Sequence, residues 1–242
     1  MRVLKVRPTI ILLITAVSML ASSLSYPDSS LGEAEKVAAS YFDMWRSHAV
    51  SNMSTNSLPS NEIDKAVLGN GYIQYNLYFQ DVVRFANSAE VDPSAFASQT
   101  WNTFPILFND KHLGSIVICH NRDETGKKRY EEEGDLILWG FHLAGDKTDA
   151  LVLKAAELYP PSEGFSQSLL VMRDGHGVIH CLVKSKNGDL YLIPRDESSA
   201  KVLGVRFQGS ATEGIELNSV LSNWKSNIKT KSKRQLEHPS LD

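Results

Sequence analysis

Residues 104–120 read FPILFNDKHLGSIVICH and follow the pattern of a β-hairpin. Two apolar runs, at 104–108 and 114–120, are joined by the polar residues 109–112. Asparagine and aspartate tolerate the positive φ angles of tight hairpin turns. The stretch therefore predicts two antiparallel strands, at the point where the chain changes from a helical to a β pattern.

Five more elements follow the hairpin. Residues 135–143 (DLILWGFHL) predict a third strand, and residues 146–159 predict a helix that the prolines 160 and 161 end. Asp174-Gly175 and Asn187-Gly188 are turn signals between the later strands. Those strands are expected at 168–173, 178–184 and 190–194.

The same order of elements occurs twice. Residues 104–156 and residues 168–205 each read as three strands followed by a helix. A duplicated βββα unit is one explanation, and the convergence of common meanders with Gly-Asp turns is the other. In either case we expect an α+β fold with one or more antiparallel sheets of about six strands.

Helices are expected to precede and follow these strands. Ser30 and Glu33 form a capping-box pattern before a helix that runs to about residue 48. Residues 72–86 alternate like a strand at first and repeat like a helix later, and we predict a helix. An amphipathic helix at 215–228 is expected to pack on the sheet.

The first 25 residues predict a signal peptide. Three basic residues precede the apolar run 9–20, and small residues that fit cleavage after Ser23 or Ser25 follow it. The protein is then secreted or periplasmic; the alternative is that the segment stays as an N-terminal membrane anchor. The remaining regions are 26–100, mainly helical; 101–230, the antiparallel α+β domain; and 231–242, a flexible basic tail.

The charge of the chain bears on its partners. The net charge is −3, and loss of the basic signal segment makes the rest more negative. Nucleic acid is therefore not expected as a partner, because its binding depends on neutralising phosphates. Five basic residues between 225 and 234 form either a patch for anionic polymers or a solvated tail, and we expect the tail.

The two cysteines leave two alternatives open. Outside the cytoplasm, Cys119 and Cys181 could form a disulfide, or each could be a buried free thiol within a strand. Each is next to a histidine, His120 or His180, as in a zinc site. Neighbours in a strand point to opposite faces, however, so at most one residue of each pair could bind a given ion.

Residues 121–132 partly match the calcium-loop template. Asn121, Asp123, Thr125 and Glu132 occupy positions 1, 3, 5 and 12, and Gly126 occupies position 6. The flanks predict strands where the template has helices, and a charged hairpin loop explains the same residues. We therefore expect no cofactor, with calcium as the alternative.

No catalytic motif is present in the sequence. A hydrolase site assembled from distant residues would use His142, His176, His180, Asp174 and Cys181. A Cys119 thiolate served by His180 is a further arrangement. The competing interpretation places the cysteines in the core, the histidines on the sheet surface and all four tryptophans at core or helix-packing positions.

These patterns favour an exported, non-catalytic binding module for a protein or an envelope polymer, with an inhibitor-like or prodomain-like role as one form. The alternatives are an extracellular hydrolase and a calcium-stabilised structural domain. Titrating side chains in a cleft would support the hydrolase.

Overall fold

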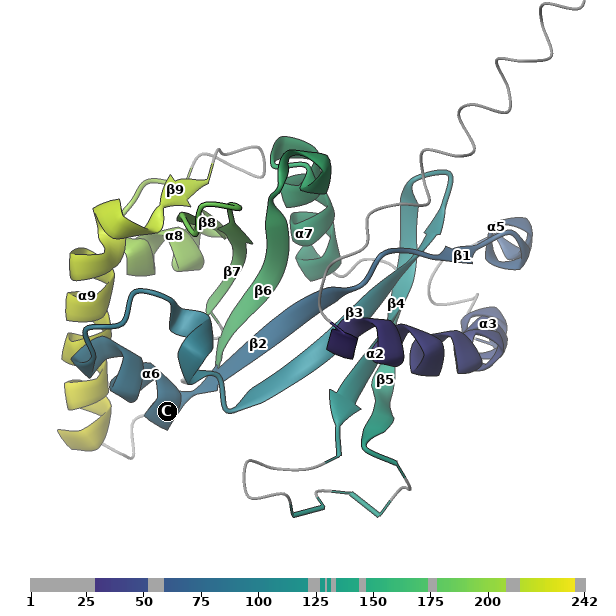
Figure 1. Cartoon of the computed structure of the whole chain (residues 1–242), viewed down its shortest axis with the longest axis horizontal. Helices are drawn as coiled ribbons and strands as arrows, with labels where there is room; N and C mark the ends of the chain where they lie inside the picture. The colour runs from purple at the N-terminus through teal and green to yellow at the C-terminus, as the bar shows by residue number, and fades with distance from the viewer. Residues whose placement is uncertain are drawn as a thin grey trace, which may run out of the picture.

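A nine-stranded sheet forms the centre of the molecule (Figure 1). The computed structural model describes residues 29–51, 59–121, 127–128, 130–131, 134–143, 147–173, 178–207 and 214–237. The strands are β1 (Val67–Leu68), β2 (Tyr72–Tyr78), β3 (Gln99–Phe108), β4 (Lys111–His120), β5 (Leu136–Leu143), β6 (Ser166–Arg173), β7 (Val178–Lys184), β8 (Leu190–Pro194) and β9 (Ile215–Glu216).

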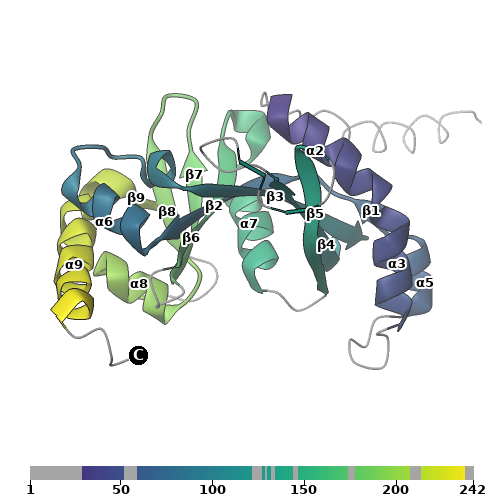
Figure 2. The same ribbon diagram turned by 90° about the horizontal axis from the view of Figure 1, so that it is seen from below.

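Helices connect and cover these strands. They are α2 (Ser29–Ser40), α3 (Phe42–Ser51), α5 (Ser60–Asp64), α6 (Phe79–Asn87), α7 (Lys147–Leu158), α8 (Glu197–Leu203) and α9 (Leu217–Glu237), with the short 3-10 helices η1 (Pro93–Phe96) and η2 (Pro161–Glu163). Figure 2 shows α6, α8 and α9 at one end of the sheet, α2, α3 and α5 at the other, and α7 between them. None of the described helices is both long and apolar enough to cross a membrane.

The sheet order is β5-β4-β3-β2-β6-β7-β8-β9, and β1 pairs with β3. All pairs are antiparallel except β2 with β6, which joins the two halves in the middle. The α+β class and the six predicted strands are confirmed as β3 to β8, but the predicted number of strands was too low because β1, β2 and β9 were missed. The strands β3 to β5 with α7, and β6 to β8 with α8, share the order of three strands and a helix. The described residues do not show a duplicated unit.

The predicted helix over residues 72–86 was wrong in its first half. Residues Tyr72–Tyr78 form the central strand β2, and the helix α6 begins at Phe79. The change of period occurs at this junction, where the Asp81 side chain accepts a hydrogen bond from the Tyr78 backbone N–H at 2.9 Å. Both sequence patterns were therefore real, but they belong to consecutive elements rather than to one.

The hairpin at residues 104–120 is confirmed. Asn109 and Asp110 form its turn with φ angles of 47° and 61°. Phe104 pairs with Ile116, and both side chains lie in the core beneath α2 and α3. The asparagine and aspartate thus supply the left-handed backbone that a two-residue turn needs.

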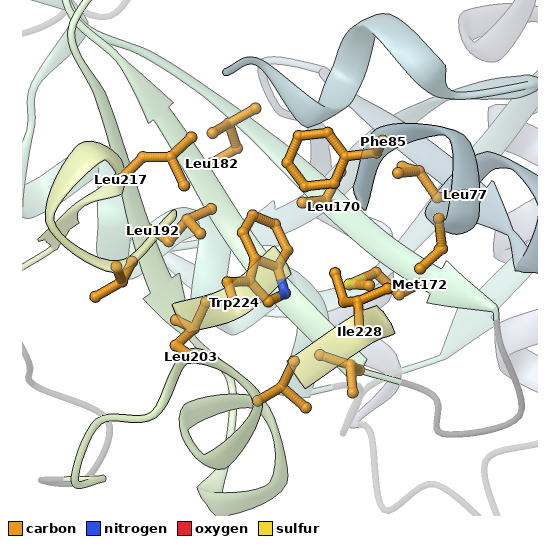
Figure 3. Packing of buried hydrophobic residues seen from close by; sticks show 14 of the residues in the cluster. Leu77, Phe85, Leu170, Met172, Leu182, Leu192, Leu203, Leu217, Trp224 and Ile228 are labelled. Carbon is orange, nitrogen blue, oxygen red and sulfur yellow. The ribbon is translucent and has the colours of Figure 1, made fainter. Parts of the chain in front are cut away.

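The sheet is covered on both faces. On one face, α2 and α3 cover β3 and β4, while α6, α8 and α9 cover β6 to β8. Figure 3 shows Trp224 of α9 in the middle of the second cluster, among Phe85, Leu192, Leu203 and Ile228. On the other face, α7 packs on β6 and β7 through Leu151, Val152 and Ala155.

The C-terminal helix is longer than its sequence pattern predicts. It continues to Glu237, so residues 231–237 are helical, and residues 238–242 lie outside the described part. Lys225 donates hydrogen bonds to the carbonyl oxygens of Ser88 and Glu90, and its Nζ lies 4.5 Å from the centre of the Phe85 ring. These contacts of Lys225 hold α9 against the C-terminal end of α6.

Candidate functional site

Most of the predicted calcium loop lies outside the described residues. This is true of Asp123, Thr125 and Glu132, whereas Asn121 is described and buried. The Asn121 side-chain oxygen accepts a hydrogen bond from the Tyr130 backbone N–H at 2.8 Å, and its amide donates to the Gly134 carbonyl. Among the described residues, no three His, Cys, Asp or Glu side chains gather in a way that could hold a metal ion.

Of the two alternatives left open for Cys119 and Cys181, the structure shows buried free thiols and not a disulfide. Both lie on the same face of the sheet, in one row of cross-strand partners. The row runs Cys119, Trp101, Gln74, Leu169, Cys181. Four strand spacings of about 4.8 Å separate the two thiols, whereas a disulfide needs Cα atoms within about 7 Å.

The structure does not bring the described hydrolase candidates together. His180 and Cys181 are neighbours on β7, so their side chains lie on opposite faces, while His142 lies on the edge strand β5. The same alternation separates His180 from Cys119, which shares the face of Cys181. Asp174 and His176 lie outside the described residues. Burial raises the pKa of the Cys181 thiol, which opposes formation of a reactive thiolate.

His180 is in the core and not on the sheet surface, where it was expected. The prediction was wrong because helices cover both faces of the sheet. The His180 ring packs edge-on against Trp224 at 5.6 Å between ring centres, and neither of its nitrogens has a hydrogen-bond partner among the described residues. Burial lowers the pKa of His180 to about 3, although the negative charge of Asp196 opposes the shift.

A buried polar cluster that the sequence did not predict surrounds Asp149, in the first turn of α7. Its carboxylate accepts hydrogen bonds from the hydroxyls of Tyr72 and Ser115, the latter at 2.9 Å. His112 Nε2 lies 3.0 Å from Asp149 Oδ2, but this nitrogen is not aligned for a conventional hydrogen bond. Burial would raise the pKa of Asp149, yet the contacts with His112, Tyr72 and Ser115 together lower it.

This cluster attaches α7 to the sheet. Tyr72 belongs to β2, while His112 and Ser115 belong to β4, so one carboxylate connects a helix to two strands. The Ser115 hydroxyl is fully buried and donates to Asp149, which leaves it unsuited to act as a nucleophile. A carboxylate in the first helical turn is also stabilised by the helix dipole. The arrangement therefore explains stability rather than catalysis.

Replacing Asp149 by asparagine is expected to lower the free energy of unfolding by about 2 kcal/mol, because the amide cannot accept all the bonds that the carboxylate accepts. Urea unfolding would measure the change. Asp43→Asn serves as the control, because the Asp43 side chain is 91% exposed in its ion pair with Arg46. Equal stability of Asp149→Asn and wild type would contradict this account of the cluster.

A cavity of about 370 Å³ lies over β2 and β6 on the face that carries α2. Figure 1 shows these strands between the groups of helices at the two ends. The volume is within the range of ligand sites. The described lining residues are Leu31, Tyr72, Ile73, Tyr75, Asp92, Ser94, Ser166, Gln167, Ser168, Leu182 and Lys184.

The cavity combines apolar walls with one ion pair. Lys184 Nζ lies 3.7 Å from Asp92 Oδ2, and the two side chains are 54% and 24% exposed. Such a long, solvated pair contributes little to stability, so both groups can form bonds to a ligand without a large loss. Ser94 donates to the other Asp92 oxygen through its backbone N–H and its hydroxyl, which fixes the carboxylate at the start of η1.

A second cavity of about 320 Å³ lies beside α7 and the turn before β2. Tyr72 and Gln167, at the starts of the two parallel strands, line both cavities. The sequence could not have located either space, because their linings combine five or more separate segments.

The chain matches no known protein-family model. It also shows no significant similarity to a curated protein or to a solved structure.

Proposed function

We propose that this chain is an exported, non-catalytic binding module that takes an extended segment of a partner protein into the larger cavity. The observation that carries the proposal is the cavity of about 370 Å³ over β2 and β6, which joins apolar walls to a solvated ion pair. Export itself rests on the signal-like residues 1–25.

An extended peptide fits this lining chemically. Leu31, Ile73 and Leu182 offer apolar contact to a side chain, while Asp92 and Lys184 can bind groups of either charge. The hydroxyl of Ser166 makes no hydrogen bond within the described residues and can bond a peptide N–H or C=O. Donors and acceptors next to an apolar wall are what a peptide backbone with alternating side chains requires.

The lining supports binding more than catalysis. Nucleophilic catalysis needs a nucleophile within hydrogen-bond reach of a base. The described lining residues include neither histidine nor cysteine. The Tyr72 hydroxyl, which could have served as an acid, is bonded to Asp149 behind the cavity.

Two variants of the mature chain test this function by paired capture from the secreted and envelope fraction of the source. Lys184→Glu places a second carboxylate beside Asp92, and Ser166→Trp fills the cavity. Lys36→Glu is the control, since Lys36 carries the same charge at an exposed position in the middle of α2. Mass spectrometry should identify one protein held by wild type and Lys36→Glu and lost with both cavity variants.

Titration of that protein should then show about tenfold weaker binding to Lys184→Glu, the effect of losing one charge-assisted hydrogen bond. A captured protein that binds the cavity variants as tightly as wild type would exclude the cavity as the binding site. If wild type and Lys36→Glu retain nothing that the cavity variants lose, the proposed function is wrong.

A further inference from the structure

The face of the sheet that carries α7 also carries the exposed aromatic side chains. Among the described residues, the exposed large aromatic ones are Trp139, at 43%, and Tyr78, at 42%. Tyr78 alternates with Asn76 and Gln74 along β2, and Gln74 pairs with Trp101. Tyr78 and Trp101 therefore share one face of the sheet, which is also the face of the two cysteines.

A β-bulge places Trp139 in this row. Ile118 of β4 pairs with Leu138 and Val117 pairs with Gly140, so Trp139 is the extra residue on β5. Bulges redirect side chains and recur beside functional sites. The centre of the Trp139 ring lies 5.1 Å from the centre of the Trp101 ring. The Tyr130 ring packs edge-on against the Trp139 ring, with 5.6 Å between their centres.

Arg173 extends the row. Its guanidinium carbon lies 4.8 Å from the centre of the Trp101 ring, and its Nε donates to Asn76 Oδ1 at 2.9 Å. Arg173 pairs with Tyr78 in the sheet, is exposed, and has no carboxylate within ion-pair distance among the described residues. We call Tyr78, Arg173, Trp101, Trp139 and Tyr130 the aromatic strip.

A covering role alone does not account for the aromatic strip. The strip does cover a small core of Val117, Cys119 and Ile137. Covering that core requires the buried ring of Trp101, which is 6% exposed, but not the half-exposed ring of Trp139. It also does not require an exposed arginine whose guanidinium lies over the Trp101 ring and donates to Asn76.

We propose that the aromatic strip binds an acidic polysaccharide, with a uronic-acid carboxylate on Arg173 and the apolar face of a neighbouring sugar ring on Trp139. A guanidinium binds a carboxylate through two parallel N–H bonds, and the contact with Asn76 already fixes its orientation. The face of an indole ring is a large apolar surface with partial negative charge, against which the C–H groups of a sugar ring can pack. The net charge of −3 means that local contacts hold the polymer, not long-range attraction.

Affinity electrophoresis of the mature chain in gels that contain polygalacturonate tests the proposal, with uncharged dextran gels as the comparison. Wild type should be retarded by polygalacturonate and not by dextran. Trp139→Ala should weaken the binding about tenfold, because most of the apolar contact area with the sugar ring is lost. Arg173→Gln should weaken it about fivefold, because one charge-assisted bond is lost.

Three matched variants should bind like wild type. Leu158→Ala removes an apolar side chain that is 40% exposed, and Arg206→Gln removes an exposed arginine outside the aromatic strip. Lys184→Glu, in the cavity of the proposed function, should also leave this binding unchanged, so the two sites are tested separately. Near-ultraviolet circular dichroism would confirm that each variant keeps its fold.

The proposal is overturned if wild type is not retarded by polygalacturonate, or if Trp139→Ala and Arg173→Gln are retarded as strongly as wild type. Equal retardation of wild type in dextran would overturn the acidic class of ligand. Trp139→Phe should retain part of the binding, because a smaller aromatic face is kept.

Discussion

Replacing Trp224 by alanine is expected to lower the free energy of unfolding by about 3–5 kcal/mol, which makes it one of the most damaging single substitutions in the chain. Trp224 is 1% exposed and contacts the rings of Phe85 and His180. It lies where α9, α6 and the strands β6 to β8 meet (Figure 3). Its loss leaves a cavity that these helices and strands would have to close together.

Guanidinium chloride unfolding would measure this change. Trp139→Ala is the matched control, since Trp139 is 43% exposed and its truncation should cost less than about 1 kcal/mol. Similar losses for the two tryptophans would show that the cluster around Trp224 does not dominate the stability of this half of the molecule.

Acidification is expected to destabilise the protein by about 2 kcal/mol between about pH 6.5 and pH 4.5 through His180 alone. The folded pKa of His180 is about 3, while the unfolded chain has an ordinary value of 6.5. The unfolded state therefore takes up the proton first. The stability is fully present above the unfolded pKa and is lost as the pH falls toward the folded value, where the total loss reaches about 4–5 kcal/mol.

His180→Leu separates this contribution from others. Asp81, Asp149 and Asp196 also have lowered pKa values, but their stabilisation is lost only as the pH falls below the ordinary value of 3.8. The leucine variant should keep its stability at pH 4.5 closer to its stability at pH 6.5. Parallel pH profiles for the variant and wild type would show that His180 is not the group that limits acid stability.

The local patterns predicted much of the fold. The hairpin turn at Asn109 and Asp110, the strands β3 to β8 and the helices α7 and α9 were all visible in periodicity and turn residues. What failed was the central strand β2. Its residues did alternate like a strand, but β2 runs directly into α6, so one window contained two periods.

The sites were much less predictable. Asp149 gave no signal, because its partners lie 34 and 77 positions away in the chain. The candidate catalytic residues were chosen by type and not by proximity, and the sheet then separated them: the Cys119–Cys181 row is as wide as four strand spacings. The order of the strands in the sheet decides how far apart two such residues lie, and turn residues do not specify that order.

Of the four tryptophans that the sequence placed at core or helix-packing positions, Trp139 is the one that the structure exposes. Trp45, Trp101 and Trp224 are buried as expected, whereas Trp139 is 43% exposed. Periodicity places it on a strand but cannot reveal a bulge, since the extra residue is defined by the register of the partner β4.

The parallel pairing of β2 with β6 has a consequence for how the chain folds. Its contacts join residues about 95 positions apart, such as Ile73 with Ser168, while β3, β4 and β5 pair with their neighbours in sequence. Closing so long a loop loses chain entropy before any contact compensates it. These long-range pairings raise the relative contact order of the chain. We therefore expect slow folding, on a timescale of about milliseconds to seconds.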